Sequence, residues 1–142
     1  MSQHVQIILV DDDIDDRQIT TSALNDAEIR VPYLYLENGV MLLEYLENTT
    51  SDKLLPALIV LDMHMPILSG LDVIRILKEH PRYRPIPVVM FSISLTDEDR
   101  QACMSCGAVD YIDKPNNYNS YKGIVAKFHG YCNKNSSTPV NA

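Results

Sequence analysis

Four short apolar runs, separated by longer polar segments, constrain the fold of this chain more than any other feature. The runs are residues 7–10, 58–61, 88–91 and the more polar 109–112. Uninterrupted apolar runs of this length are typical of strands that are buried on both faces, as in a parallel sheet. A fifth run, 31–36, contains Pro32. Because proline cannot donate a hydrogen bond to a neighbouring strand, we expect the fifth strand at an edge of the sheet.

The segments between these runs carry helix signals. Ser69 with Asp72, and Thr96 with Asp99, have the spacing of capping boxes, and Gly107 is placed to end the second of these two helices. Apolar side chains at helical spacing predict three further helices, at 15–27, 40–47 and 118–131.

Strands and helices therefore alternate five times. This order predicts an α/β fold, a doubly wound five-stranded parallel sheet with helices on both faces. In such sheets ligands bind beyond the carboxyl ends of the strands, so the residues that follow each strand are the candidate site.

The length of 142 residues corresponds to one domain, which we expect over residues 1–131. We expect residues 132–142 to form a disordered polar tail. Because so short a tail cannot fold by itself, no output domain is expected after the last helix, and the chain should act through its own surface.

Net charge and hydropathy limit which binding partners and which cellular location we expect for this chain. The net charge is −7 and no cluster of Lys and Arg occurs, so we expect neither nucleic acid nor a membrane as a partner. No apolar run approaches the roughly 20 residues of a membrane span, and the first six residues lack a signal-peptide pattern. A cytoplasmic protein is expected.

The three cysteines, Cys103, Cys106 and Cys132, do not indicate a disulfide framework, because their number is odd. The CxxC spacing of the first two occurs in redox and zinc sites. Here it closes a predicted helix instead of opening one, and no second pair exists to complete a zinc site. We interpret both as ordinary helix residues one turn apart.

Four of the predicted strands are followed by polar residues of complementary chemistry. Asp11 and Asp12 follow the first run and Asp62 the second, whereas Ser92 follows the third and Lys114 the fourth. Parallel topology would gather carboxylates, a hydroxyl and an ammonium at one edge of the sheet.

These motifs, in this order and spacing, resemble the signature of response-regulator receivers. The likeness extends from about Val5 to Phe128 and implies the flavodoxin-like (CheY-like) strand order 2-1-3-4-5, which also puts the strand with Pro32 at an edge. The motifs are Val10-Asp11-Asp12, Leu61-Asp62-Met63-His64-Met65-Pro66 with Gly70, Phe91-Ser92, and Asp110-Tyr111-Ile112-Asp113-Lys114-Pro115.

The resemblance implies a phosphorylation switch rather than a conventional enzyme. Asp62 would accept the phosphoryl group, Ser92 would contact it and Lys114 would pair with it. Tyr111 would be the aromatic side chain that reports the switch. The bond between Lys114 and Pro115 would be cis, which aims the lysine inward. Such a domain catalyses only its own phosphorylation and a slow autodephosphorylation.

The resemblance also implies Mg²⁺ as a cofactor, held by Asp11, Asp12, Asp62 and the backbone carbonyl of His64. Electrostatics supports this independently, because unit charges about 4 Å apart repel by about 4 kcal/mol at an effective dielectric constant of about 20. Clustered carboxylates therefore call for a cation, and an all-oxygen site suits Mg²⁺. Asp15 and Asp16 are interpreted as solvated residues of a helix N-terminus.

The family implies a histidine kinase or a phosphotransfer protein as the phosphodonor, and a downstream protein target that binds the last helices. Either a monomer or a phosphorylation-dependent homodimer is expected. The alternative is a phosphorylation-independent receiver-like scaffold, although such proteins typically lose the acceptor or the acidic pair. A metal-dependent phosphatase would need a further general acid, for which only His64 is available. The DDxxD motif of isoprenoid synthases fits residues 11–15 but belongs to larger all-α chains.

Three positions depart from the family pattern. Ile93 stands where a small residue usually follows the switch hydroxyl, and it could crowd the phosphoryl pocket. Residues 116–119 lack the usual apolar residue directly after the proline, which leaves the position of the last helix open. His64, two residues after Asp62, either modulates the lifetime of the phosphoryl group or is an ordinary loop residue.

Overall fold

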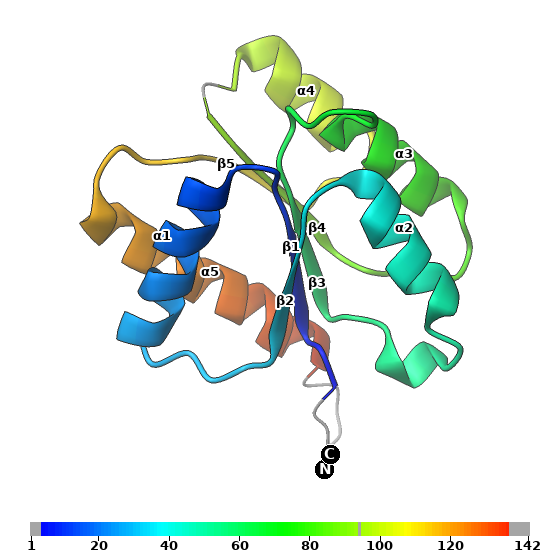
Figure 1. Cartoon of the computed structure of the whole chain (residues 1–142). Helices are drawn as coiled ribbons and strands as arrows, with labels where there is room; N and C mark the ends of the chain where they lie inside the picture. Colours follow the sequence, from blue (N-terminus) through cyan, green and yellow to red (C-terminus); the bar gives the residue numbers. More distant parts are fainter. Residues whose placement is uncertain (1–3, 94, 137–142) are drawn as a thin grey trace.

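The computed structural model describes residues 4–93 and 95–136 (Figure 1). Strands and helices alternate as the sequence predicts. The strands are β1 (Ile7–Val10), β2 (Tyr33–Leu36), β3 (Leu58–Leu61), β4 (Val88–Ser92) and β5 (Asp110–Asp113). The helices are α1 (Ile14–Asp26), α2 (Gly39–Asn48), the short 3-10 helix η1 (Asp52–Leu54), α3 (Gly70–Glu79), α4 (Asp97–Ser105) and α5 (Tyr118–Ser136).

The five strands form one parallel sheet in the order β2-β1-β3-β4-β5, which confirms the predicted fold class and topology. β2 lies at an edge, as expected from its proline. Pro32 directly precedes the strand, and its carbonyl accepts a hydrogen bond from the backbone N–H of Gln6 at 2.8 Å. The proline thus contributes an acceptor where it has no donor to offer.

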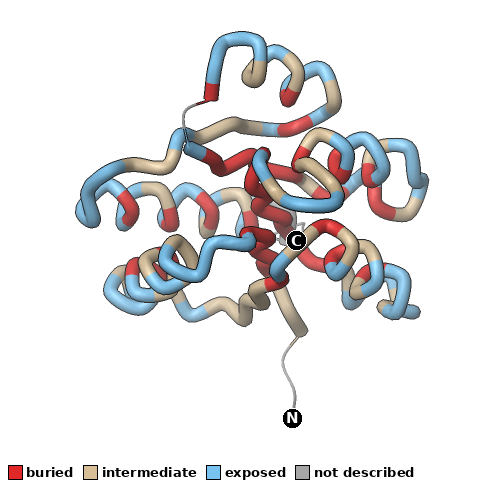
Figure 2. Tube along the Cα trace, turned by 45° about the horizontal axis from the view of Figure 1, so that its top comes forward, coloured by how far each residue is buried: buried red, intermediate tan, exposed pale blue. Residues whose placement is uncertain are grey.

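Helices cover both faces of the sheet. α1 and α5 lie on one face, and α2, α3 and α4 lie on the other (Figure 1). Alternate residues of β1 enter different cores: Ile8 and Val10 pack beneath α2 and α3, whereas Ile7 and Leu9 pack beneath α1 and α5. The most deeply buried segments of the chain are the central strands (Figure 2). Burial on both faces explains why these strands are apolar throughout.

The N-terminal starts of α3 and α4 confirm the predicted capping boxes. The hydroxyl of Ser69 accepts from the N–H of Asp72 at 3.1 Å, and the hydroxyl of Thr96 accepts from that of Asp99 at 3.0 Å. Both acidic side chains bond back to the cap residue, which completes the two capping boxes. Gly107 follows α4 with a φ of 107°, a left-handed conformation that glycine adopts without strain.

α5 is longer than predicted, because it ends at Ser136 and not at residue 131. Cys132 is only 2% exposed and packs in the core with Phe128, one turn earlier. The helix continues because this small, buried thiol extends its apolar face, whereas the next residue, Asn133, is exposed. Residues 137–142 of the expected tail lie outside the described residues. None of the helices in the described ranges is both long and apolar enough to cross a membrane.

Candidate functional site

Three carboxylates gather at the carboxyl edge of the sheet. Val10 pairs with Leu61 in the neighbouring strand, so Asp11 and Asp62, the residues that follow, leave the sheet side by side. Asp11, Asp62 and Asp12 each offer an oxygen within 4.8 Å of the others. The first two are buried and Asp12 is exposed. The structure thus brings together the three acidic residues that the sequence placed in one site.

Local hydrogen bonds fix the first carboxylate. Asp11 Oδ1 accepts from the backbone N–H of Asp13 at 2.9 Å. Asp13 is in turn the N-cap of α1, and its side chain accepts from the N–H groups of Asp15 and Asp16. The turn between β1 and α1 therefore forms because short acidic side chains satisfy the free N–H groups of a helix start.

The carboxylate of Asp62 has partners from two different loops. Its Oδ1 accepts from the backbone N–H of His64 at 2.9 Å and from the hydroxyl of Ser92 at 2.7 Å. Ser92 ends β4 and is fully buried, so its hydroxyl has been brought to Asp62 by the pairing of β3 with β4. This confirms that the sheet places the predicted hydroxyl beside the predicted acceptor.

The loop that follows Asp62 returns against its own backbone at Gly70, the first residue of α3. The N–H of Gly70 donates to the carbonyl of Met63 at 2.9 Å. A Cβ on Gly70 would lie 2.5 Å from the carbonyl oxygen of Asp62 and 2.9 Å from the Cα of Met63. Only glycine allows the start of α3 to approach the strand end this closely.

Lys114 lies at the centre of the site. Its Nζ is 2.6 Å from Asp11 Oδ2 and 2.9 Å from Asp62 Oδ2. A third carboxylate, that of Asp16, accepts at 2.8 Å. The side chain of Lys114 is only 2% exposed. A buried ammonium is stable here because all three of its N–H groups donate to charged acceptors.

The predicted cis bond between Lys114 and Pro115 is wrong. No peptide bond in the described ranges is cis, so this bond is trans. The trans isomer is the more stable one for a bond before proline, by about 0.5–1 kcal/mol. The long side chain of Lys114 reaches the carboxylates from the trans backbone, so aiming it inward does not require the cis isomer.

The surroundings of the two buried carboxyl groups raise the pKa of Asp11 and lower the pKa of Asp62. Burial raises the pKa of Asp11 to about 6, although Lys114 works against it. Burial alone would raise the pKa of Asp62 too, but hydrogen bonds from Lys114, the His64 N–H and Ser92 outweigh it and hold the pKa below its ordinary value. Burial disfavours the charged form of Lys114, but the three carboxylates outweigh burial and raise its pKa. At neutral pH, Asp62 is an anion beside a cation.

Asp16 is the residue that sequence reasoning missed. Its side chain is only 15% exposed and bonds to Lys114, so the interpretation as a solvated helix end is wrong for Asp16. The interpretation holds for Asp15, which is exposed. Its position in the sequence was the one available indication that Asp16 lies near the site. Asp16 is the third residue of α1, and the N-cap of this helix is only two residues past the buried Asp11.

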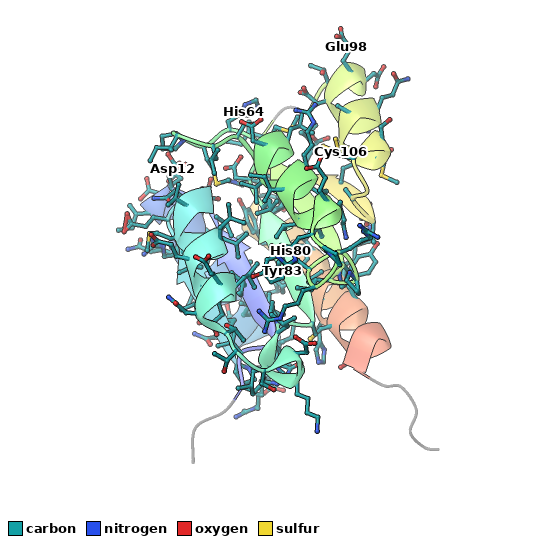
Figure 3. The ribbon with its side chains drawn as sticks, turned by 90° about the vertical axis from the view of Figure 1, so that its right-hand side faces the viewer. Asp12, His64, His80, Tyr83, Glu98 and Cys106 are labelled. Carbon is teal, nitrogen blue, oxygen red and sulfur yellow. The ribbon has the colours of Figure 1, made fainter. Side chains whose placement is uncertain are left out.

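The remaining predicted residues lie around this centre. His64 is exposed, and it and Asp12 lie toward the upper end of the view in Figure 3. The role of the His64 carbonyl stays a prediction. Ile93 is 56% exposed, so its side chain does not fill the buried part of the site. Tyr111 is half-buried, with the guanidinium of Arg100 5.0 Å from its ring centroid.

The start of α5 is positioned by polar contacts in place of the missing apolar residue. The side chain of Asn117 accepts from the N–H of Ser120 at 2.9 Å, which caps the helix. The hydroxyl of Tyr118 donates to Asp26 at the end of α1 at 2.5 Å. α5 is thereby held against α1, which resolves the question that residues 116–119 left open.

The side chains of this site are suited to bind a cation and an anion next to each other. Its donor set of clustered carboxylate oxygens fits a hard divalent cation such as Mg²⁺, because such ions take oxygen ligands. The ammonium and the hydroxyl beside Asp62 are suited to bind the oxygens of an anion attached there. Asp62 itself is ionised, as a nucleophile must be.

Comparisons with known proteins agree with this chemistry. The model of the response regulator receiver domain matches residues 7–126. A 14.6 kDa protein of Leptolyngbya boryana is 32% identical over 111 residues, which cover 78% of this chain and 79% of that protein. The chemotaxis protein CheV1 of Helicobacter pylori is 33% identical over 78% of this chain, which spans only 34% of that protein. Among solved structures, the phosphorylated cyanobacterial phytochrome response regulator RcpA matches with a TM-score of 0.81 and 25% identity, covering 98% of this chain and 99% of the other.

Proposed function

Because the chain belongs to the response regulator receiver family, we propose that Asp62 accepts a phosphoryl group and that the chain is a phosphorylation switch in a two-component or phosphorelay pathway. The observation that carries the proposal is the environment of Asp62. This ionised carboxylate lies between the ammonium of Lys114 and the hydroxyl of Ser92 at the carboxyl edge of the sheet.

In the proposed reaction a carboxylate oxygen of Asp62 attacks the phosphorus of a phosphohistidine. The bond between phosphorus and the imidazole nitrogen breaks, and its electron pair returns to the imidazole, which takes up a proton. A negative nucleophile must approach a negative phosphoryl group, so the barrier depends on local cations. Lys114 supplies one positive charge and remains in contact with the phosphoryl oxygens of the product.

Asp11, Asp12 and Asp62 are the residues proposed to hold Mg²⁺, with the backbone carbonyl of His64 as a further ligand. When bound, the ion would neutralise the carboxylates and the phosphoryl oxygens together. We also expect a slow autodephosphorylation, in which water attacks the phosphorus, the bond between phosphorus and the Asp62 oxygen breaks, and inorganic phosphate leaves while Asp62 returns to a carboxylate. His64 is a candidate modulator of this step because it is exposed two residues from Asp62.

We expect the hydroxyl of Ser92 to couple phosphorylation of Asp62 to a change at the protein surface. In the unphosphorylated protein it donates to Asp62 Oδ1 at 2.7 Å. A phosphoryl group offers oxygens farther from the carboxyl carbon, so the hydroxyl would follow them and draw the loop before α4 toward the site. Tyr111, half-buried beneath Arg100, could then rotate inward. Phosphorylation would shift a pre-existing equilibrium, and the altered surface of α4, β5 and α5 would bind a protein target or a second copy.

Receiver domains take their phosphoryl groups from histidine kinases or phosphotransfer proteins, and we expect such a donor for this chain. A labelling experiment tests the acceptor. The protein is incubated with acetyl phosphate and Mg²⁺, and its intact mass should rise by one phosphoryl group. Asp62→Asn should take no label, whereas Asp72→Asn, which removes an exposed carboxylate at α3, should be labelled like the parent. Equal labelling of Asp62→Asn would overturn the assignment, and an unlabelled parent protein would favour the phosphorylation-independent scaffold.

The switch is tested by backbone amide NMR with and without beryllofluoride, which stands in for the phosphoryl group. Shifts are expected in α4 and at Tyr111 as well as next to Asp62. Shifts confined to the immediate neighbourhood of Asp62 would show that the signal leaves by another route.

A further inference from the structure

All three N–H groups of the Lys114 ammonium have acceptors, and these come from three different carboxylates. Asp11 and Asp62 are two of them, at 2.6 and 2.9 Å. Asp16, on the first turn of α1, is the third, at 2.8 Å. The lysine is 2% exposed, so water cannot easily replace a lost acceptor.

Two of the three acceptors change during the reaction proposed above. Asp62 gives up its negative charge when one of its oxygens is bonded to phosphorus. Asp11 belongs to the group of oxygens that would surround a cation. Asp16 is not part of that group of oxygens, and it is not the residue proposed to be phosphorylated. Of the three acceptors, Asp16 is therefore the one that neither the phosphoryl group nor the cation would engage.

The position of Asp16 is itself fixed. Its backbone N–H donates to the N-cap side chain of Asp13 at 3.3 Å, which anchors the first turn of α1. Its side chain is 15% exposed, and a carboxylate in the first turn of a helix is stabilised by the positive end of the helix dipole. Asp15, the preceding residue, is exposed. The two neighbouring acids thus face different surroundings.

We infer that Asp16 is a positioning residue for phosphoryl transfer, which keeps the ammonium of Lys114 in its place beside the phosphorylation site before, during and after the reaction. Lys114 touches the phosphoryl group, and Asp16 acts only through Lys114. This role rests on the proposed phosphorylation of Asp62. It matters because a lysine side chain has four rotatable bonds and loses its bond to Asp62 at the moment when the phosphoryl group arrives. Asp16 is the fixed anchor at that moment.

Charge alone predicts the opposite effect, which makes the role testable. Removing a carboxylate beside an anion-binding site should speed phosphorylation if Asp16 acts only through its negative charge. Removing an anchor should slow it. With acetyl phosphate and Mg²⁺, we expect Asp16→Asn to lower the rate of phosphorylation by about tenfold, the size of one lost charge-assisted hydrogen bond. Asp15→Asn removes the same charge one residue away and should change the rate less than twofold.

Two further variants separate positioning from a general loss of structure. Asp16→Glu keeps a carboxylate within reach of Lys114 and should recover most of the rate. In a Lys114→Ala background, Asp16→Asn should no longer slow phosphorylation and should speed it slightly, because only the repulsion then remains. If Asp16→Asn slows both backgrounds equally, Asp16 does not act through the lysine.

A readout without phosphoryl transfer is the NMR signal of the Lys114 ammonium group. Burial and three hydrogen bonds should make its exchange with water slow enough to observe in the unphosphorylated protein without Mg²⁺. Asp16→Asn should shift and weaken this signal, and Asp15→Asn should leave it unchanged. An unaltered signal, or a rate in Asp16→Asn equal to or above that of the parent, would overturn the positioning role while leaving phosphorylation of Asp62 intact. A parent protein that takes no label would overturn the proposed function and this role with it.

Discussion

Gly70→Ala is expected to destabilise the fold and to displace Asp62, the proposed acceptor, because of the close approach of Gly70 to the end of β3. The new Cβ would lie 2.5 Å from the Asp62 carbonyl oxygen, 2.7 Å from Met90 Cε and 2.9 Å from Met63 Cα. Two of these three atoms belong to backbone that cannot move without shifting the end of β3. Overpacking of this kind typically costs about 1–3 kcal/mol. Alanine recovers less than about 1 kcal/mol through its better helix propensity at a helix start.

The expected net loss in the free energy of unfolding is therefore about 1–2 kcal/mol, which lowers the melting temperature by about 3–8 °C for a chain of this size. Circular dichroism during thermal and urea unfolding measures it. Gly123→Ala is the matched control, since Gly123 is an exposed helical position with nothing within 4 Å of the added methyl group. The control should be stabilised by up to about 1 kcal/mol. A Gly70→Ala protein as stable as the parent, and labelled by acetyl phosphate at the same rate, would refute the reasoning.

Three further predictions follow from individual contacts. Asp12→Asn should weaken Mg²⁺ binding by at least about tenfold in isothermal titration calorimetry, because one anionic oxygen ligand is lost; an unchanged affinity would count against the site. Burial raises the pKa of Asp11, a proposed Mg²⁺ ligand, to about 6, so below that pH the binding of Mg²⁺ there would require the loss of a proton. The affinity for Mg²⁺ should thus be level above about pH 7 and fall by up to about tenfold per unit below pH 6, whereas a level affinity down to pH 5 would contradict this. Tyr131 donates to Asp110 Oδ2 at 2.7 Å, so Tyr131→Phe should cost about 1 kcal/mol in urea unfolding, and no loss would show that this bond contributes nothing.

Local signals account for the parts of the fold that were predicted correctly. β1 and β3 are apolar because both of their faces are covered, and the capping boxes at Ser69 and Thr96 depend on residues only three positions apart. Both patterns involve residues that are close together along the chain, so they can be recognised from the sequence without knowledge of the tertiary structure. The end of α5 was misplaced because Cys132 looks like the start of a polar tail until the core that buries it is known.

The site was predictable to the extent that topology controls it. Parallel strands deliver Asp11, Asp62 and Ser92 to one edge whatever the details of packing, so their meeting follows from the order of the elements. The isomer of the bond between Lys114 and Pro115 did not follow in this way. A backbone isomer depends on the path of a whole loop, and a flexible lysine reaches the same carboxylates from the trans form.

The sequence by itself determined the order of strands and helices, the edge position of the strand after Pro32 and the presence of five aspartates between residues 11 and 16. Tertiary structure alone decided what each aspartate does. Asp12 faces solvent, Asp13 caps α1, and Asp16 bonds to a lysine 98 positions away along the chain. That last contact depends on how closely the first turn of α1 approaches the loop after β5. The approach is set by the packing of α1 and α5 on one face of the sheet, and no pattern among neighbouring residues encodes it.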